Sequence, residues 1–293
     1  VMYQRAGLGK ALVVGRADDV KAKLTAAGME DAYRELEVVN AANTQHLETY
    51  KSFLYNRLQR KGSDSKDIHR LAARDRHVFA ALMLAHGHGD GLVTGATRKS
   101  AHVLERLNHV FDANAKHGAV GITALLHKGR IVFIGDTLVH EWPNEEDLAN
   151  IAEKGAKVAR HMGLEPRVAF VSFSTFGYPV SERAEKMQRA PDVLDARGVD
   201  FEYEGEMTVD VALNAESQKN YSFSRLTGPA NILVVPARHS ASISVKLMQE
   251  MAGATVIGPI LTGLDKSIQI CSTTSTANDI LNMAILAACK VGE

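Results

Sequence analysis

Residues 131–171, IVFIGDTLVHEWPNEEDLANIAEKGAKVARHMGLEPRVAFV, contain the signals that decide the fold class. A helix is predicted over residues 144–162, because Pro143 precedes it, acidic residues fill its first turn and a glycine follows it. Short runs rich in β-branched residues flank this helix at residues 131–134 and 168–171. This order of strand, helix and strand is the repeating unit of a parallel sheet.

The same alternation extends in both directions along the chain. A strand at residues 10–15, a helix from Asp18 to Ala27 that Gly28 ends, and an apolar run at residues 36–39 predict another such unit. Further helices are predicted over residues 44–60, 65–86, 100–116 and 277–288. Further strands are predicted at residues 91–95, 120–126, 201–203, 232–235, 255–257 and 268–271. The pattern predicts an α/β fold whose mostly parallel sheets are covered by helices on both faces.

The composition excludes several classes of protein. The 293 residues are 45% hydrophobic and 23% charged, as in soluble globular proteins, and suggest two domains or one large one. Because 34 basic residues balance 34 acidic ones, no global positive field favours nucleic acid as a partner. No apolar run reaches the roughly 18 residues that a membrane span needs. Cys271 and Cys289 lie in apolar segments, which predicts reduced core cysteines in a cytoplasmic protein.

The N-terminal residues VMYQR have neither the pattern of a signal peptide nor an initiator methionine at position 1. We therefore expect a fragment of a longer chain. Processing of a complete protein, or residues left by cloning, is the alternative explanation.

In open α/β sheets, ligands bind beyond the carboxyl ends of the strands. Four polar segments follow predicted strands, at residues 94–97, 172–177, 236–238 and 272–276. The last, Ser-Thr-Thr-Ser-Thr, directly precedes a predicted helix. Its hydroxyl groups and free backbone N–H groups would lie at the positive end of the helix dipole, where phosphate binds well. Alternatively, one hydroxyl only caps the helix and the others are solvated.

Familiar catalytic motifs are absent from the sequence. Residues 7–10 and 87–89 do not complete a dinucleotide-binding fingerprint, and neither a P-loop nor a Gly-x-Ser-x-Gly elbow occurs. Ten of the twelve histidines fall between residues 46 and 140, among them His86 and His88. These two lie at a predicted helix end, where histidines favour the dipole, whereas a metal site needs three or four convergent ligands. We expect no metal site.

Taken together, these segments resemble the phosphate acetyl/butyryl transferase family over almost the whole chain. The resemblance is carried by Asp90-Gly91, Thr94-Gly95-Ala96, Gly135-Asp136-Thr137, Pro166-Arg167-Val168-Ala169, Ser172-Phe173-Ser174, Gly205-Glu206-Met207, Asp210, Ala230-Asn231, Pro236, Gly258-Pro259-Ile260-Leu261 and Asp279-Ile280-Leu281-Asn282-Met283. Phe176 stands where active transacetylases usually have lysine, and residues 258–283 align without a gap to one branch. That branch is the C-terminal transacetylase-like domain of the large NADP-dependent malic enzymes.

The resemblance implies two three-layer α/β domains of the phosphotransacetylase-like fold, with a coenzyme A cleft between them and a homodimer as the usual assembly. Residues 1–117 and 264–293 would form the first domain, which lacks the family's opening strand and helix. Residues 118–263 would form the second domain. The N-terminal malic enzyme domains of the same chain would be partners, and NADP and a divalent metal would bind there, with no cofactor in this domain.

Several positions depart from the family's active members. The Ser-Arg-Gly tripeptide of active transacetylases is replaced by Ser272-Thr273-Thr274, and two of their arginines align with Glu105 and Glu250. Loss of one preorganised donor to the reacting group costs roughly 3 kcal/mol of transition-state stabilisation. Asp279 matches the family's general base, but without the phosphate clamp a role as a first-turn aspartate of the helix is favoured.

We therefore expect a regulatory domain that is not itself catalytic and that binds acetyl-CoA as an allosteric effector of malate decarboxylation. The expected ligand contacts are Thr97, Arg98, Ser172, Ser174, Asn231, Lys246, Ser272 and Thr273. Each of these residues has a structural alternative. For example, Asn231 and Ser172 could only satisfy turn backbone, and Lys246 could be a solvated helix residue. Two other functions stay open. One is an active phosphate acetyltransferase that uses Arg98, Arg106 or Arg238, and the other is a structural dimerisation module.

Overall fold

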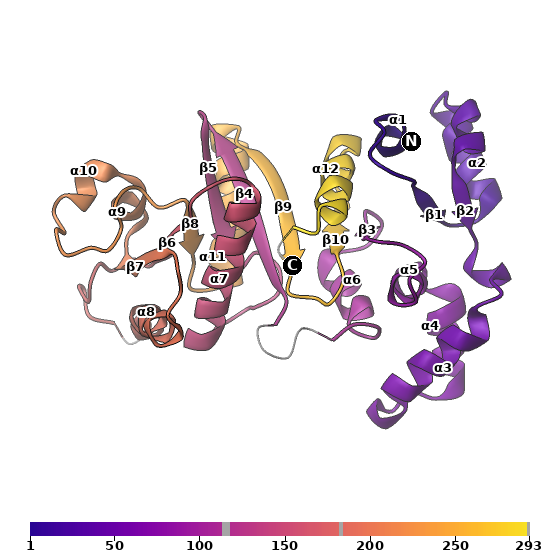
Figure 1. The fold of residues 1–293 in the computed structure, drawn as a ribbon, viewed down its shortest axis with the longest axis horizontal. Coiled ribbons are helices and arrows are strands. Elements are labelled where there is room, and N and C mark those ends of the chain that lie inside the picture. The colour runs from indigo at the N-terminus through magenta and orange to yellow at the C-terminus, as the bar shows by residue number, and fades with distance from the viewer. Residues whose placement is uncertain (113–117, 182–183, 292–293) are drawn as a thin grey trace. The chain divides into compact units, whose positions relative to one another are not determined.

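The computed structural model describes residues 1–112, 118–181 and 184–291 (Figure 1). The chain separates into two compact units. Unit 1 comprises Val1–Asp112 and Lys266–Cys289, and unit 2 comprises Ala113–Asp265 and Lys290–Glu293. The domain boundary that the sequence predicts at residues 117 and 118 adjoins residues 113–117, which lie outside the described residues.

Unit 1 contains two pairs of parallel strands surrounded by helices. Its elements are α1 (Met2–Arg5), β1 (Leu12–Val14), α2 (Ala17–Ala26), η1 (Glu30–Glu35), β2 (Glu37–Val39), η2 (Ala41–Asn43), α3 (Leu47–Leu58), η3 (Gln59–Lys61), α4 (Ser65–Arg74), α5 (Arg76–Ala85), β3 (Leu92–Gly95), α6 (Ser100–Leu107), β10 (Ile268–Cys271) and α12 (Ala277–Ala288). Strand β1 pairs with β2, and β10 pairs with β3. Helices α5, α6 and α12 pack against β3 or β10.

The helix predicted over residues 65–86 is in fact two helices, so this prediction was wrong. Asp75 is extended between α4 and α5, and its carboxylate accepts hydrogen bonds from the backbone N–H groups of His77 (3.0 Å) and Val78 (3.2 Å). An aspartate in this position caps a new helix. The helix predicted from Asp18 instead has Arg16 as its N-cap. The helix predicted over 100–116 ends at Leu107, and its last predicted residues lie outside the described part of the chain.

Unit 2 is built around a six-stranded sheet in the order β7-β6-β8-β5-β4-β9. Its elements are β4 (Val120–His127), β5 (Arg130–Gly135), α7 (Glu145–His161), β6 (Arg167–Val171), α8 (Glu185–Arg197), β7 (Glu202–Met207), α9 (Val209–Leu213), α10 (Ala215–Gln218), β8 (Ile232–Val234), α11 (Arg238–Ala252) and β9 (Thr255–Thr262). Strand β4 is antiparallel to both of its neighbours, and the other pairings of this sheet are parallel. The α/β class with predominantly parallel sheets is thereby confirmed.

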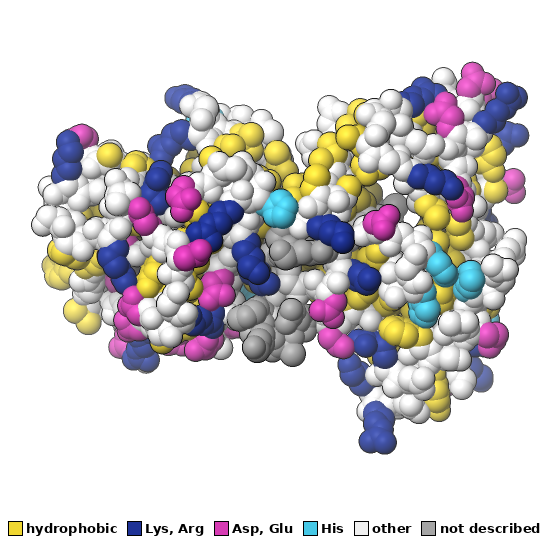
Figure 2. All heavy atoms as spheres, viewed as in Figure 1, with side chains coloured by type: hydrophobic (Ala, Val, Ile, Leu, Met, Phe, Trp, Pro, Cys, Tyr) yellow, Lys and Arg dark blue, Asp and Glu magenta, His cyan; other side chains and the backbone are white. Residues whose placement is uncertain are grey.

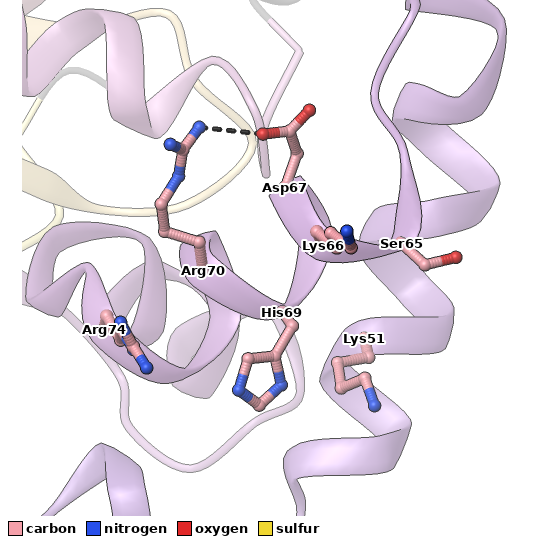
Figure 3. A pocket seen from close by; sticks show the side chains of 7 residues that line it. All are labelled: Lys51, Ser65, Lys66, Asp67, His69, Arg70 and Arg74. Carbon is pink, nitrogen blue, oxygen red and sulfur yellow. Dashed lines mark hydrogen bonds and ion pairs between the residues drawn. The ribbon is translucent and has the colours of Figure 1, made fainter.

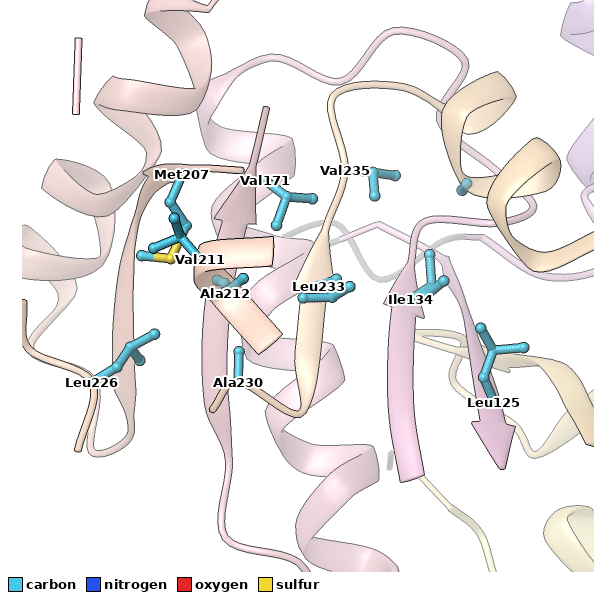
Figure 4. Packing of buried hydrophobic residues seen from close by; sticks show 12 residues of the cluster. Leu125, Ile134, Val171, Met207, Val211, Ala212, Leu226, Ala230, Leu233 and Val235 are labelled. Carbon is cyan, nitrogen blue, oxygen red and sulfur yellow. The ribbon is translucent and has the colours of Figure 1, made fainter. Parts of the chain in front are cut away.

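Helices cover both faces of this sheet. Successive residues of a strand point to opposite faces, so the helix that packs on each residue identifies the face that this helix covers. On β8, a Cβ atom added at Gly155 of α7 would lie 2.9 Å from Ile232. The next residue, Leu233, belongs instead to a core cluster that includes Ala241 of α11 and residues of α9. Figure 4 shows this second core, in which Val211 and Ala212 of α9 lie over the strands that carry Val171 and Leu233. Helix α7 therefore lies on one face and helices α9 and α11 on the other.

Helix α7 begins where the sequence predicts a helix start, next to Asn144. The Asn144 side chain accepts a hydrogen bond from the Asp147 backbone N–H (2.9 Å), and the Asp147 carboxylate accepts one from the Asn144 backbone N–H (3.0 Å). Three acidic residues occupy its first turn, where they stabilise the helix dipole. The capping box fixes where α7 starts, and thereby how its apolar face meets the sheet.

The surface has the mixed charge that the composition predicts, and basic and acidic side chains alternate over the face shown in Figure 2. Within the described part of the chain, every helix is too short or too polar to span a lipid bilayer. Both cysteines are free thiols, and Cys271 is buried. Cys289 is exposed, so the prediction of a core position for it was wrong. It is the C-cap residue of α12, beyond the last turn that packs against the strands.

Candidate functional site

Two parallel strands of unit 1 end side by side. Cys271, the last residue of β10, pairs with Gly95, the last residue of β3, and the backbone N–H of Ala96 donates a hydrogen bond to the Cys271 carbonyl (3.2 Å). A Cβ atom at Gly95, where φ is +104°, would lie 2.2 Å from that carbonyl oxygen. Only glycine permits this approach. The polar segments that follow β3 and β10 therefore begin at the same edge.

This edge brings together four of the predicted ligand contacts. Thr97 and Arg98 follow β3, and Ser272 and Thr273 follow β10, and all four side chains are exposed. The hydroxyl of Ser272 accepts a hydrogen bond from the Thr274 backbone N–H (3.2 Å). Three residues with hydroxyl groups and one arginine thus follow the carboxyl ends of two paired parallel strands, a composition that suits an anionic ligand.

The carboxylate of Asp279 forms part of the helix cap. Its Oδ2 accepts hydrogen bonds from the backbone N–H of Thr276 (2.8 Å) and from the Thr276 hydroxyl (2.9 Å). The Thr276 hydroxyl in turn accepts from the backbone N–H of Asp279 (3.2 Å), which completes a capping box for α12. This geometry agrees with the first-turn role that the sequence favoured for Asp279. A carboxylate held in this way is engaged in the fold before any substrate arrives.

His77 is a residue of this region that the sequence analysis missed. It lies in the first turn of α5, and its Nδ1 is 2.7 Å from the hydroxyl of Thr94 on β3. Burial lowers the pKa of the His77 imidazole, so the neutral ring orients the Thr94 hydroxyl at the end of the strand. Because the sequence predicts one continuous helix over this stretch, no local signal assigned His77 to a helix start beside β3.

The neighbouring charges of α6 are already partly paired. Arg106 lies 3.4 Å from the carboxylate of Asp75 and is half-buried. Glu105, which aligns with an arginine of active transacetylases, is exposed and lies 4.0 Å from Arg106. Arg106 is held by the half-buried carboxylate of Asp75, which leaves it poorly placed to clamp a phosphate.

In unit 2, Ser172 and Ser174 follow the carboxyl end of β6. Ser174 is fully buried, and its hydroxyl donates a weak hydrogen bond to the Ser172 hydroxyl (3.4 Å). The Ser172 backbone N–H donates to the carbonyl of Met207 on the next strand (2.9 Å). The two hydroxyls therefore lie together at the strand end, with Ser172 the more accessible.

Asn231 lies at the opposite end of the sheet from these serines. It directly precedes β8, which runs parallel to β6. Its Oδ1 accepts from the backbone N–H of Arg167 (2.8 Å), and its Nδ2 donates to the carbonyl of Glu165 (2.7 Å). Both functions of the amide bridge the amino ends of two strands, which supports the structural alternative for Asn231.

Lys246 and Glu250 are exposed on successive turns of α11. They lie within the helix, several residues beyond the strand end that Arg238 follows. Arg238 itself donates to the Leu138 carbonyl (3.2 Å) and lies 3.5 Å from the carboxylate of Glu141. The structure therefore groups the predicted contacts into an edge of unit 1, a strand end of unit 2 and single residues elsewhere in unit 2.

The histidines at the end of α5 belong to an aromatic cluster. The Tyr50 hydroxyl is 2.7 Å from Nδ1 of His88, the rings of His46 and His88 lie 4.5 Å apart, and His86 contacts Tyr50. In the described ranges, no group of three or more His, Cys, Asp or Glu side chains is arranged to hold a metal ion.

A basic depression of about 460 Å³ lies on helices α3 and α4 of unit 1 (Figure 3). Its lining residues are Lys51, Ser65, Lys66, Asp67, His69, Arg70 and Arg74. Two of its cations pair with acidic residues of their own helices, Arg70 with Asp67 (2.8 Å) and Lys51 with Glu48 (2.9 Å). None of the predicted ligand contacts lines this depression.

Both the sequence and the fold of this chain match one known family. Residues 1–288 match the family described as phosphate acetyl/butaryl transferase. The chain belongs to this family. Within the family, it is 46% identical over its full length to the NADP-dependent malic enzyme of Rhizobium meliloti and 38% identical over 95% of its length to the probable NADP-dependent malic enzyme of Rickettsia prowazekii. It spans 38% of the length of each of these relatives.

One further relative shares less sequence, and a solved structure shares the fold. The phosphate acetyltransferase of Bacillus subtilis is 28% identical over 79% of this chain and 72% of its own length. A phosphotransacetylase from Streptococcus pyogenes superposes with a TM-score of 0.90 at 24% identity, covering 99% of this chain and 88% of that one. These comparisons confirm the predicted family and the phosphotransacetylase-like fold.

Proposed function

We propose that this chain is a regulatory domain of an NADP-dependent malic enzyme, that it binds acetyl-CoA, and that it does not transfer acetyl groups. One observation carries the proposal. The segment that carries Arg98 and the segment that carries Ser272 and Thr273 begin at the paired ends of β3 and β10, while the carboxylate of Asp279 is engaged in the α12 cap. Groups that can bind a phosphate are present. In contrast, Asp279, which matches the family's general base, accepts hydrogen bonds from the backbone N–H and the hydroxyl of Thr276.

The similarity to malic enzymes supports the regulatory part of this proposal. The chain spans 38% of the length of those relatives, and we assign oxidative decarboxylation of malate, with NADP and a divalent metal, to the remaining domains of such a cytoplasmic enzyme. Acetyl-CoA bound to this domain would shift an equilibrium of the attached domains. Coupling of this kind commonly amounts to about 1–3 kcal/mol and acts in both directions.

Malate decarboxylation by the full-length enzyme that carries this chain tests the regulatory role. We expect acetyl-CoA to inhibit it and Arg98→Glu to weaken inhibition at least about tenfold, because a charge-assisted contact contributes about 1.5–3 kcal/mol and reversal adds repulsion. Lys21→Glu reverses a positive charge in the same way at an exposed position of α2. This control variant should leave inhibition unchanged. Equal inhibition of all three proteins would contradict the assignment of Arg98.

Formation of acetyl-CoA from acetyl phosphate and coenzyme A tests the non-catalytic part. Turnover on the order of 1 per second or more would identify an active transferase instead. The pairing of Arg106 with Asp75 and of Arg238 with Glu141 argues against that outcome, because two of the cations that it would need have acidic partners. A domain that neither turns over nor binds acetyl-CoA would be a structural module.

We further propose a homodimer, supported by an exposed apolar stripe on α11. Ile243, Leu247 and Met251 recur every four residues, and 64%, 58% and 79% of their respective surfaces are exposed. Large apolar side chains grouped in this way are typical of protein contacts. Light scattering should give twice the chain mass, and Leu247→Glu should give the monomer mass. A wild-type monomer would contradict the proposal.

A further inference from the structure

The sheet of unit 2 contains a point where the chain leaves neighbouring strands in opposite directions. Strands β5 and β8 are parallel neighbours, and Gly135 pairs with Val234 at their carboxyl ends. Helix α7 follows β5 and packs on the face of Ile232, while α11 follows β8 and packs on the face of Leu233. Connections that diverge in this way open a crevice at the strand ends, where open α/β sheets bind ligands.

The only tryptophan of the sequence lies at this point. Trp142 belongs to the segment between β5 and α7, and 69% of its surface is exposed. Its ring lies 4.9 Å from the ring of His239, in the first turn of α11, at an angle of 60°. One aromatic residue from each diverging connection therefore contributes to a shared, solvent-accessible surface.

Lys186 ties a third connection to this surface. It lies in α8, after β6, and its Nζ donates hydrogen bonds to the carbonyls of Pro143 (3.1 Å) and Pro236 (3.0 Å). The same ammonium group lies 5.7 Å from the centre of the Trp142 ring. Arg238 adds a second cation, paired with Glu141. The segments after β5, β6 and β8 are thus held together around an exposed indole ring with positive charge beside it.

We propose that Trp142, His239 and Lys186 form a binding site for a purine nucleotide. The exposed indole face offers a stacking surface for a planar base. Stacking of a base on an aromatic side chain contributes about 1–3 kcal/mol of binding free energy. Lys186, whose ammonium group lies beside the ring, supplies positive charge for a phosphate group. The nucleotide is either free or the nucleotide end of acetyl-CoA, and the second source rests on the function proposed above.

Tryptophan emission reads out this site directly, because Trp142 is the single tryptophan. The probes are ADP, acetyl-CoA and acetylpantetheine, which lacks the nucleotide. We expect saturable quenching by ADP or by acetyl-CoA and none by acetylpantetheine. Quenching by ADP alone identifies a free nucleotide, and stronger quenching by acetyl-CoA identifies the coenzyme. If neither nucleotide probe changes the emission at millimolar concentration, the proposal is overturned.

Variants separate stacking from general effects on the fold. Calorimetry with the quenching ligand should show affinity reduced about tenfold or more in Trp142→Ala, and less in Trp142→Phe, which keeps an aromatic face. Tyr178→Ala removes another exposed aromatic residue of unit 2, after β6, and should have no effect. Unchanged affinity in Trp142→Ala would overturn the proposal. If acetyl-CoA also bound this variant normally, the site would fail while the proposed function would stand.

Discussion

Nδ1 of His140 lies 2.8 Å from Oδ2 of Asp136, a carboxylate that is almost completely buried. The same carboxylate accepts hydrogen bonds from the backbone N–H groups of Gly121 and Leu138. Nε2 of His140 points toward Asp147 of the α7 capping box, 3.8 Å away. A protonated His140 therefore links the end of β5 to the start of α7, close to the proposed Trp142 site.

This link predicts a pH-dependent contribution to the stability of unit 2. The hydrogen bond to Asp136 raises the pKa of His140 above its value in the unfolded chain. Its stabilising effect is therefore fully present below the unfolded pKa of about 6.5 and is lost as the pH rises through the folded pKa. We expect His140→Gln to cost about 2 kcal/mol at pH 5.5 and clearly less at pH 9.

Urea unfolding followed by Trp142 emission measures this effect, because the tryptophan lies in the same unit. His127→Gln, at the end of β4, is the matched control for the loss of a histidine from the same sheet. A destabilisation by His140→Gln that is equal at both pH values would exclude a contribution from the protonated ring.

Gly155 allows α7 to approach the sheet. A Cβ atom there would lie 2.9 Å from Cγ2 of Ile232. Alanine favours a helix over glycine by about 1 kcal/mol, whereas overpacking a core costs about 1–3 kcal/mol. We expect Gly155→Ala to destabilise unit 2 by about 1 kcal/mol in a background with Ile232 and to be neutral or stabilising in an Ile232→Ala background. A double-mutant cycle without coupling would contradict this explanation.

Gly95 sets the spacing of the candidate acetyl-CoA edge. Gly95→Ala would force a Cβ atom against the Cys271 carbonyl. We therefore expect the free energy of unfolding to fall by about 3 kcal/mol or more. Denaturant unfolding monitored by circular dichroism measures this loss. Gly87 also has a positive φ, of +79°, but open space around it. Gly87→Ala should cost only the backbone strain of about 1–2 kcal/mol. Similar losses in both variants would show that the close approach at Gly95 is unimportant.

The two thiols should differ sharply in reactivity. Burial, followed by the charge of Asp279, raises the pKa of Cys271 to about 11, while Cys289 is exposed. Since the thiolate is the reactive form, a thiol reagent at pH 8 should label one cysteine per native chain and two in urea. Rapid labelling of both cysteines in the native protein would contradict the buried position of Cys271.

Local signals in the sequence predicted much of the fold. The helix predicted at residues 277–288 and the strand at 268–271 agree with α12 and β10 in both bounds. The N-terminal signals of α7 were equally reliable, since the proline and the acidic residues of the first turn act within one turn of the helix start. Where the signal was ambiguous, prediction failed. Apolar periodicity runs through Asp75, so its capping role was visible only in the structure.

Long-range placement could not be predicted in the same way. The pairing of β3 with β10 joins distant parts of the chain, and only this pairing explains why Thr97 and Ser272 share an edge. Asn231 was selected for its place near a strand, but it lies at the amino end, because the strand begins just after it. His77 had no signal at all, since its contact with Thr94 depends on the break between two helices.

Binding of acetyl-CoA at the edge formed by β3 and β10 is the step on which the proposed function depends. Calorimetric titration of this chain with acetyl-CoA tests it most directly, with the Arg98→Glu and Lys21→Glu variants titrated in parallel. We expect saturable binding that weakens about tenfold or more in Arg98→Glu and is unchanged in Lys21→Glu. An absence of binding heat at millimolar acetyl-CoA, or equal affinity in all three proteins, would contradict it.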